Sequence, residues 1–125
     1  MVVGTGVDIV ETARIRGLLE RHGETFLRRW FDDREIEYCM GKIHPERHLA
    51  ARFAAKEAVF KALRLSAKDP VCWKHIVVDK ASDGNPILVL RAEPKATADR
   101  LGLSALHLSI SHCGDYALAM VTAER

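Results

Sequence analysis

The stretch Ala51–Leu63, ARFAAKEAVFKAL, predicts the helix around which the rest of the chain is organised. Ala and Leu are frequent in it and neither Gly nor Pro interrupts it, so its helix propensity is high. At about 100° per residue, its large apolar side chains lie on one side and its alanines on the other. A helix with so little polar surface is expected to be buried on two sides.

Charged side chains interrupt this apolar pattern. Lys56 falls within the large apolar stripe, while Glu57, Lys61 and Arg64 lie along one edge of it. Burying an unpaired charge is costly, so these residues are expected either to be paired or to serve a functional site. For Glu57 and Lys61, which are one helical turn apart, a simple stabilising ion pair is the plain alternative.

The composition is typical of one ordinary globular domain spanning residues 1–125, with 48% hydrophobic and 29% charged residues. The sequence contains no apolar run long enough for a membrane span and no signal-peptide pattern at its N-terminus. Its three cysteines, Cys39, Cys72 and Cys113, show neither disulfide nor zinc spacing. We therefore expect a cytoplasmic protein without a membrane partner. A net charge of +2 is too small to indicate nucleic acid as a partner.

The order of the expected elements predicts an α+β fold, with an antiparallel sheet packed around the long central helix. Thr12 is expected to cap the second element, and Asp32 with Glu35 resembles a capping box. Pro45 is expected to open the central helix, and a loop containing Pro70 follows that helix. The expected strands are 2–10, 76–80, 87–91, 107–112 and 116–123, and the expected helices are 12–22, 33–42, the central helix and 94–102, with a short helical or turn segment at 26–31.

Two carboxylates on different elements are candidates for a metal site: Asp8 on the first strand and Glu57 on the central helix. Mg²⁺ in proteins commonly takes one or two carboxylates and completes its shell with waters and substrate phosphates. The plain alternative for Asp8 is a carboxylate satisfied by backbone donors. His112 ends a strand beside Ser109 and Ser111, where it is either structural or part of a phosphate-binding rim.

Three segments together resemble the small holo-acyl-carrier-protein synthases of the 4′-phosphopantetheinyl transferase superfamily. Residues 4–11, GTGVDIVE, are similar to the family pattern G-[IV]-D. Residues 52–63, RFAAKEAVFKAL, are similar to F-[AS]-x-K-E-[AS]-x-x-K. Residues 109–112, SISH, followed by Tyr116 and Ala117, are similar to the closing segment of the small members.

The resemblance implies transfer of the 4′-phosphopantetheine arm of coenzyme A to a serine of an apo acyl carrier protein, with release of 3′,5′-ADP, in fatty-acid or polyketide lipid metabolism. It implies Mg²⁺ held by Asp8 and Glu57, with Lys61 completing the catalytic group. Lys56 could contact phosphate as well or hold Glu57 in place. The general base stays open among Glu57, Lys61, Asp8 and a metal-bound water. The residues implied to bind coenzyme A are Arg52, Lys56, Lys61 and His112.

The resemblance also implies a homotrimer with active sites between protomers, and a docking surface for an acidic carrier protein at Arg14, Leu18 and Arg21. After Leu63 many family members carry a Gly-Thr-Gly loop, whereas here residues 64–68 read RLSAK. Two rival functions stay open. One is a Mg²⁺-dependent phosphohydrolase using the same carboxylates, and the other is a non-catalytic docking module using the Arg14 and Arg21 face.

Overall fold

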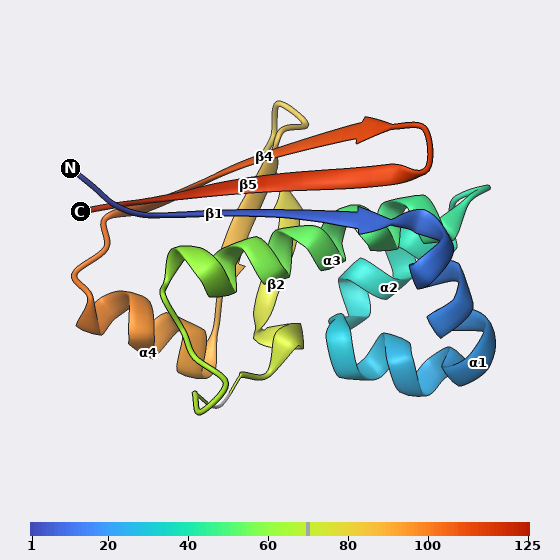
Figure 1. Cartoon of the computed structure of the whole chain (residues 1–125), viewed down its shortest axis with the longest axis horizontal. Coiled ribbons are helices and arrows are strands. Elements are labelled where there is room, and N and C mark those ends of the chain that lie inside the picture. The colour runs from blue at the N-terminus through green and yellow to red at the C-terminus, as the bar shows by residue number, and fades with distance from the viewer. Residues whose placement is uncertain (70) are drawn as a thin grey trace.

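The computed structural model describes residues 1–69 and 71–125, so Pro70, expected in the loop after the central helix, lies outside the described residues. The arrangement confirms the α+β prediction (Figure 1). The elements in chain order are β1 (Val2–Glu11), α1 (Thr12–Trp30), α2 (Asp33–Met40), α3 (Pro45–Ala62), the short 3₁₀ turn η1 (Trp73–His75), β2 (Ile76–Lys80), β3 (Pro86–Leu90), α4 (Ala92–Arg100), β4 (Ala105–Cys113) and β5 (Tyr116–Glu124).

The strands form two antiparallel sheets rather than the one sheet expected from the sequence. β1, β5 and β4 pair in that order, while β2 and β3 form a separate hairpin. Because the first and last strands are neighbours, the two chain termini lie side by side (Figure 1). The terminal amino group of Met1 donates to the carbonyl oxygen of Arg125 at 2.8 Å.

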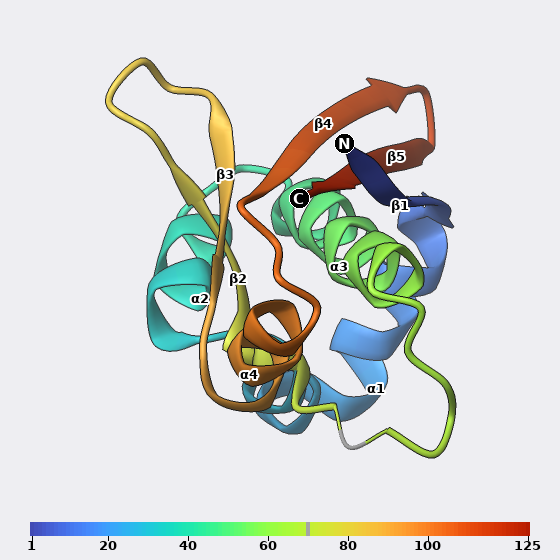
Figure 2. The same ribbon diagram turned by 90° about the vertical axis from the view of Figure 1, so that its left-hand side faces the viewer.

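The central helix α3 lies between the larger sheet and the other helices. Figure 2 shows α3 with the β1-β5-β4 sheet on one side, α1 on the other and the β2–β3 hairpin beside it. The helix packs against β1, β5 and α1, and its buried side chains run from Leu49 to Ala62. This arrangement confirms that α3 is buried on more than one side.

β1 lies so close to α3 that two of its positions have no room for a side chain. A Cβ added at Gly4 would overlap the carbonyl oxygen of Ala62, and one added at Gly6 would overlap that of Ala58. Glycines on the strand and alanines on the helix therefore let the two backbones approach. The same close packing brings Asp8, two residues beyond Gly6, to the flank of α3.

Local signals predicted most helix ends. Asp32 and Glu35 form the expected capping box at the start of α2, and Pro45 opens α3. The expected cap at Thr12 is wrong, because Glu11 occupies the cap position and makes no side-chain bond there. α1 runs to Trp30 but is interrupted by a kink at Gly23 (φ 48°, ψ −124°), so the expected helix at 12–22 and the helical segment at 26–31 lie on either side of that kink.

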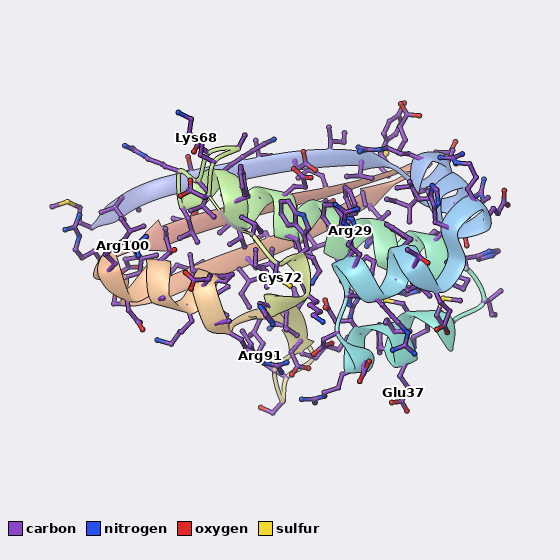
Figure 3. The ribbon with its side chains drawn as sticks, turned by 90° about the horizontal axis from the view of Figure 1, so that it is seen from below. Arg29, Glu37, Lys68, Cys72, Arg91 and Arg100 are labelled. Carbon is purple, nitrogen blue, oxygen red and sulfur yellow. The ribbon has the colours of Figure 1, made fainter. Side chains whose placement is uncertain are left out.

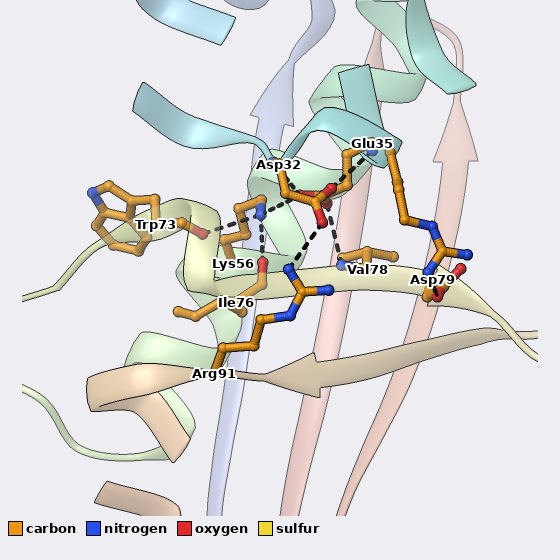
Figure 4. A network of polar contacts seen from close by, with 9 residues as sticks. Asp32, Glu35, Lys56, Trp73, Ile76, Val78, Asp79 and Arg91 are labelled. Carbon is orange, nitrogen blue, oxygen red and sulfur yellow. Dashed lines mark hydrogen bonds and ion pairs between the residues drawn. The ribbon is translucent and has the colours of Figure 1, made fainter. Parts of the chain in front are cut away.

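Lys56 is fully buried, and its ammonium group is paired as the sequence required. Nζ donates to Oε1 of Glu35 at 2.8 Å, to the carbonyl of Trp73 at 3.1 Å and to the carbonyl of Ile76 (Figure 4). The second carboxylate oxygen of Glu35 accepts from the backbone N–H of Val78 at 3.1 Å. Burial raises the pKa of Glu35 and lowers that of Lys56, while their mutual attraction opposes both shifts. The pair ties α2, α3 and the start of β2 together.

Within the described ranges, no helix is both long and apolar enough to cross a membrane.

Candidate active site

Asp8, Glu57 and Lys61 come together where β1 passes α3. Side chains alternate along β1, and Asp8 points to the same side as the buried Gly6 and Val10, toward the helix. Nζ of Lys61 donates to the carbonyl of Val7 at 2.8 Å and to Oδ1 of Asp8 at 3.2 Å. Glu57 lies one turn before Lys61 on α3, so the three side chains share one edge of the helix.

Glu57 is half-buried and lies within the electrostatic influence of Asp8. Burial raises the pKa of Glu57, and the negative charge of Asp8 raises it further. The positive charges of Lys61 and Arg14 act in the opposite direction. Two carboxylates that repel each other in a half-buried position fit a divalent cation with a preference for oxygen ligands.

Protein ligands alone would not complete such a coordination shell. In the described part of the chain, no three His, Cys, Asp or Glu side chains gather closely enough to hold an ion between them. A two-carboxylate site leaves the remaining positions of an octahedral ion to water and to oxygen atoms of a substrate. This arrangement suits a magnesium ion that binds together with a phosphate-bearing molecule.

The structure places Lys56 away from the carboxylate site. The sequence had led us to expect that Lys56 contacts phosphate or holds Glu57 in place. Its side chain is 0% exposed, and its three N–H donors are directed at Glu35, Trp73 and Ile76. A buried ammonium with three acceptors cannot reach a ligand in solvent. Lys56 therefore has a structural role, and the expectation that it binds a ligand or Glu57 is wrong. The reason is that Lys56 lies on the side of α3 that faces α2 and β2.

A second group of charged side chains surrounds Tyr38 of α2. Nζ of Lys42, Nζ of Lys80 and Cζ of Arg52 each lie 4.5 Å from the centre of the Tyr38 ring. The hydroxyl of Tyr38 also contacts Nζ of Lys80 at 2.6 Å, and this bond lowers the pKa of Tyr38. Three cations around one ring repel each other, so the cluster is suited to an anion.

Two further observations indicate that this cluster is open to a ligand. Arg52 is only 7% exposed, and its Nε has no hydrogen-bond partner within the described residues. A pocket of about 170 Å³ lies beside it, lined in part by Tyr38, Arg52 and Lys80. A buried guanidinium nitrogen without a partner is costly unless something else binds it.

His112 lies near the end of β4, and its charge acts on His48, which neighbours this second group. The ring of His48 lies 5.9 Å from that of Tyr38. Burial lowers the pKa of His48, and the nearby charges of Arg52, Lys42 and His112 lower it further. Of this cluster, the sequence indicated only Arg52 and His112. Tyr38, Lys42, His48 and Lys80 come from separate elements and carry no shared motif, so sequence spacing offered no signal for them.

The two groups lie on opposite sides of α3. His48 and Glu57 are nine residues apart on the helix, which corresponds to about two and a half turns. Arg52 follows His48 by one turn on the same side. Within a single protomer, therefore, Asp8, Glu57 and Lys61 lie together. Arg52 and His112 of the same protomer do not join them.

The proposed docking residues lie beside the carboxylate site. Arg14 and Leu18 line a pocket of about 310 Å³ between α1 and α3. The guanidinium of Arg14 lies 5.3 Å from the ring centre of Phe53, one turn before Glu57. Arg21 is exposed on the same helix, so the basic face of α1 continues from the site outward.

The segment that replaces the Gly-Thr-Gly loop forms a turn of its own. Arg64 adopts a positive φ of 55°, a conformation that favours glycine. Asp69 accepts hydrogen bonds from the backbone N–H and the hydroxyl of Ser66, and Lys68 lies at the outer edge of the turn (Figure 3). Trp73 then stacks on Trp30 at 4.4 Å, which anchors the chain before β2.

Comparison with known proteins places this chain among well-defined relatives. A sequence model described as "4'-phosphopantetheinyl transferase superfamily" matches residues 4–121. A holo-[acyl-carrier-protein] synthase from Geotalea daltonii is 39% identical over 125 residues, covering 100% of both chains. Among solved structures, the holo-[acyl-carrier-protein] synthase from Neisseria meningitidis superposes with a TM-score of 0.91 at 32% identity, covering 100% of both chains. The enzyme from Helicobacter pylori in complex with coenzyme A superposes with a TM-score of 0.83 at 32% identity, covering 96% of this chain and 99% of that one.

Proposed function

Because the chain belongs to the 4′-phosphopantetheinyl transferase superfamily, we propose that it moves the phosphopantetheine group of coenzyme A to a serine of an apo acyl carrier protein. We propose further that the reaction needs Mg²⁺ and releases 3′,5′-ADP. The convergence of Asp8, Glu57 and Lys61 on one edge of α3 is the observation that carries this proposal. Phosphoryl transfer depends mainly on positioning and charge neutralisation, which these side chains can supply.

In this proposal Asp8 and Glu57 hold the magnesium ion. When bound, the ion neutralises charge on the pyrophosphate oxygens of coenzyme A as the diphosphate bond breaks. Lys61 lies next to Asp8 and has a long, half-exposed side chain, so it can place its ammonium against a phosphate oxygen. The serine hydroxyl proton would pass to one of the groups gathered at this site, Glu57, Lys61, Asp8 or a metal-bound water.

We propose that the cluster around Tyr38 binds another phosphate of coenzyme A, the 3′-phosphate. The positive charges of Arg52, Lys42 and Lys80 converge there, and the unpartnered Nε of Arg52 offers a donor. We propose that His112, whose charge acts on His48, contributes as well. Charge-assisted bonds from guanidinium and ammonium groups are well suited to phosphate oxygens.

The separation of the two groups supports a site shared between protomers. We propose a homotrimer in which the cluster of one protomer completes the carboxylate site of its neighbour. The outer face of the β1-β5-β4 sheet offers an apolar contact surface, since Ile9 is 61% exposed and Met120 is 48% exposed. Such a continuous exposed apolar surface on a small protein marks an interaction site. The face comprises Val7, Ile9, Tyr116, Leu118 and Met120.

The acyl carrier protein would dock on α1. Arg14 and Arg21 present positive charge, and Leu18 lies between them at the edge of an apolar pocket. An acidic carrier would be guided to this face by charge, and its serine would be delivered next to Glu57. We also propose that the enzyme works in the cytoplasm in fatty-acid or polyketide metabolism, where its three free thiols would stay reduced.

The decisive experiment is mass spectrometry of an apo acyl carrier protein incubated with coenzyme A, Mg²⁺ and this protein. We expect the carrier to gain one phosphopantetheine and 3′,5′-ADP to appear in equal amount. Asp8→Ala and Glu57→Ala are expected to abolish the transfer while the fold stays intact. Two substitutions test the docking surface. Arg14→Glu and Arg21→Glu should each raise KM for the carrier and leave coenzyme A binding unchanged.

The same assay separates the two rival functions. A phosphohydrolase would release 3′,5′-ADP from coenzyme A when no carrier is present. A non-catalytic docking module would bind the carrier without modifying it, and it would tolerate Asp8→Ala and Glu57→Ala. A Glu57→Ala variant with full magnesium-dependent activity would contradict the proposed site.

A further inference from the structure

We propose that Lys61 is a built-in counter-ion of the metal site, which holds Asp8 until the divalent cation enters and is displaced by that cation. The inference rests on the magnesium site proposed above and concerns how that site is loaded. It assigns to Lys61 a task that precedes any contact with substrate.

The carboxylates of Asp8 and Glu57 need a positively charged partner both before and after a divalent cation binds. Asp8 and Glu57 are close enough for the charge of one to raise the pKa of the other. Two ionised carboxylates in a half-buried position repel each other. Water screens this repulsion less there than it would at a fully exposed position. The positive charges of Lys61 and Arg14 act on Glu57 in the opposite direction.

Of these two cations, Lys61 is the one in contact with Asp8. Its Nζ bridges the carbonyl of Val7 at 2.8 Å and Oδ1 of Asp8 at 3.2 Å. The Lys61 side chain is 50% exposed, so it can turn away by rotating its own bonds. Arg14 is held differently, because its guanidinium stacks over the ring of Phe53.

A divalent cation and the Lys61 ammonium would compete for the same carboxylate. Mg²⁺ needs an oxygen of Asp8 in its inner shell, and a second positive charge within a few ångströms would be repelled strongly. Lys61 therefore leaves when the cation binds. Its ammonium then becomes available to a phosphate oxygen of the substrate, so loading the metal and freeing the lysine are one event.

The first test is the affinity of the metal-free protein for Mn²⁺, measured from the electron paramagnetic resonance signal of the unbound ion. We expect Lys61→Met to bind Mn²⁺ at least about fivefold more tightly than the wild type, since a competing ion pair is removed. Lys61→Arg keeps the competitor and should not tighten binding. Lys68→Met removes the same charge from the turn after α3 (Figure 3) and should leave the affinity within about twofold. Equal or weaker binding by Lys61→Met would overturn the proposal.

The second test measures whether the Lys61 side chain leaves Asp8 when the cation binds, rather than the effect of removing the charge of Lys61. The wild-type protein is treated briefly with an amine-acetylating reagent, and the extent of modification at Lys61 and Lys68 is read by peptide mass spectrometry. We expect Mn²⁺ to increase modification of Lys61 several-fold relative to Lys68, because the ammonium loses its two acceptors. In Asp8→Asn, which removes a proposed metal ligand, the modification of Lys61 should not respond to Mn²⁺. Modification of wild-type Lys61 that does not respond to Mn²⁺ would show that the lysine stays in place.

These measurements also distinguish failure of this inference from failure of the proposed function. If Asp8→Asn binds Mn²⁺ as tightly as the wild type, the magnesium site itself is wrong, and the counter-ion role falls with it. If binding requires Asp8 but neither the affinity of Lys61→Met nor the labelling of Lys61 changes, only the counter-ion role is wrong.

Discussion

Nζ of Lys56 and Oε1 of Glu35 lie 2.8 Å apart, and the two side chains are 0% and 1% exposed. Apart from the bond between them, their polar atoms are directed at the N-cap residue of α2, at η1 and at β2 (Figure 4). A buried ion pair is weak evidence for net stability, but removing one partner leaves an uncompensated charge.

We therefore expect Lys56→Met to lower the free energy of unfolding by about 3–5 kcal/mol, because Glu35 and two carbonyls lose their donor. Chemical denaturation monitored by circular dichroism measures this loss. The double variant Lys56→Met/Glu35→Leu should recover part of it, since both charges are then absent. Losses that simply add in the double variant would show that the two side chains are not coupled.

Gly6→Ala is expected to destabilise the protein by about 3 kcal/mol or more, because its Cβ would overlap the carbonyl oxygen of Ala58 and no flexible side chain can yield. The separation of β1 from α3 should also move Asp8 away from Glu57 and weaken Mn²⁺ binding. Thr5→Ala, on the exposed face of the same strand, is the matched control and should change neither property.

The raised pKa of Glu57 predicts a pH-dependent stability deficit. From the ordinary value of 4.5 up to the raised folded pKa, the native state binds more protons than the unfolded state, so stability falls as pH rises. Above that window the deficit is constant. Glu57→Gln should therefore be more stable than the wild type at about pH 8 without metal, and the difference should vanish below about pH 4.

Urea unfolding in a chelating buffer at the two pH values measures this difference. Glu37→Gln, on the exposed side of α2 (Figure 3), is the control and should show no such pH-dependent gain. Mg²⁺ should stabilise the wild type more than Glu57→Gln, because the ion binds the carboxylate that is costly to ionise. Equal stabilisation of both proteins would argue against Glu57 as a ligand.

The cluster around Tyr38 predicts discrimination for the 3′-phosphate of coenzyme A. Lys80→Met should raise KM for coenzyme A about tenfold, because one charge-assisted contact is lost. The same variant should leave KM for dephospho-coenzyme A nearly unchanged, since that molecule lacks the 3′-phosphate. Steady-state kinetics with both substrates measures the ratio. Lys95→Met, on the exposed side of α4, is the control.

The apolar face of the larger sheet predicts self-association. If the proposed trimer forms, Met120→Glu should convert it to monomers and reduce transfer activity, because a charge is placed in the proposed contact surface. Light scattering after size-exclusion chromatography gives the molar mass. Ile43→Glu is the control, since Ile43 is 92% exposed but belongs to the connection between α2 and α3 rather than to the sheet. A monomeric wild type would contradict the shared site.

The sequence alone determined the elements and the core of the site. The helix α3, both hairpins and the Asp32–Glu35 capping box follow from local periodicity, turn residues and caps, which act over a few residues. Asp8 and Glu57 were predicted as metal ligands because a carboxylate within an apolar stretch of sequence needs a positively charged or hydrogen-bonding partner. The family resemblance then related the two segments that the fold brings side by side.

Only the tertiary structure decided which distant groups meet. Glu35, the partner of Lys56, lies 21 residues away on another helix, and no spacing rule connects them. The cations around Tyr38 come from the α2–α3 connection, α3 and β2, and the strands divide into two sheets rather than one. These pairings depend on how helices and strands pack in three dimensions, because the close approach of separate segments is set by volume and burial rather than by sequence spacing.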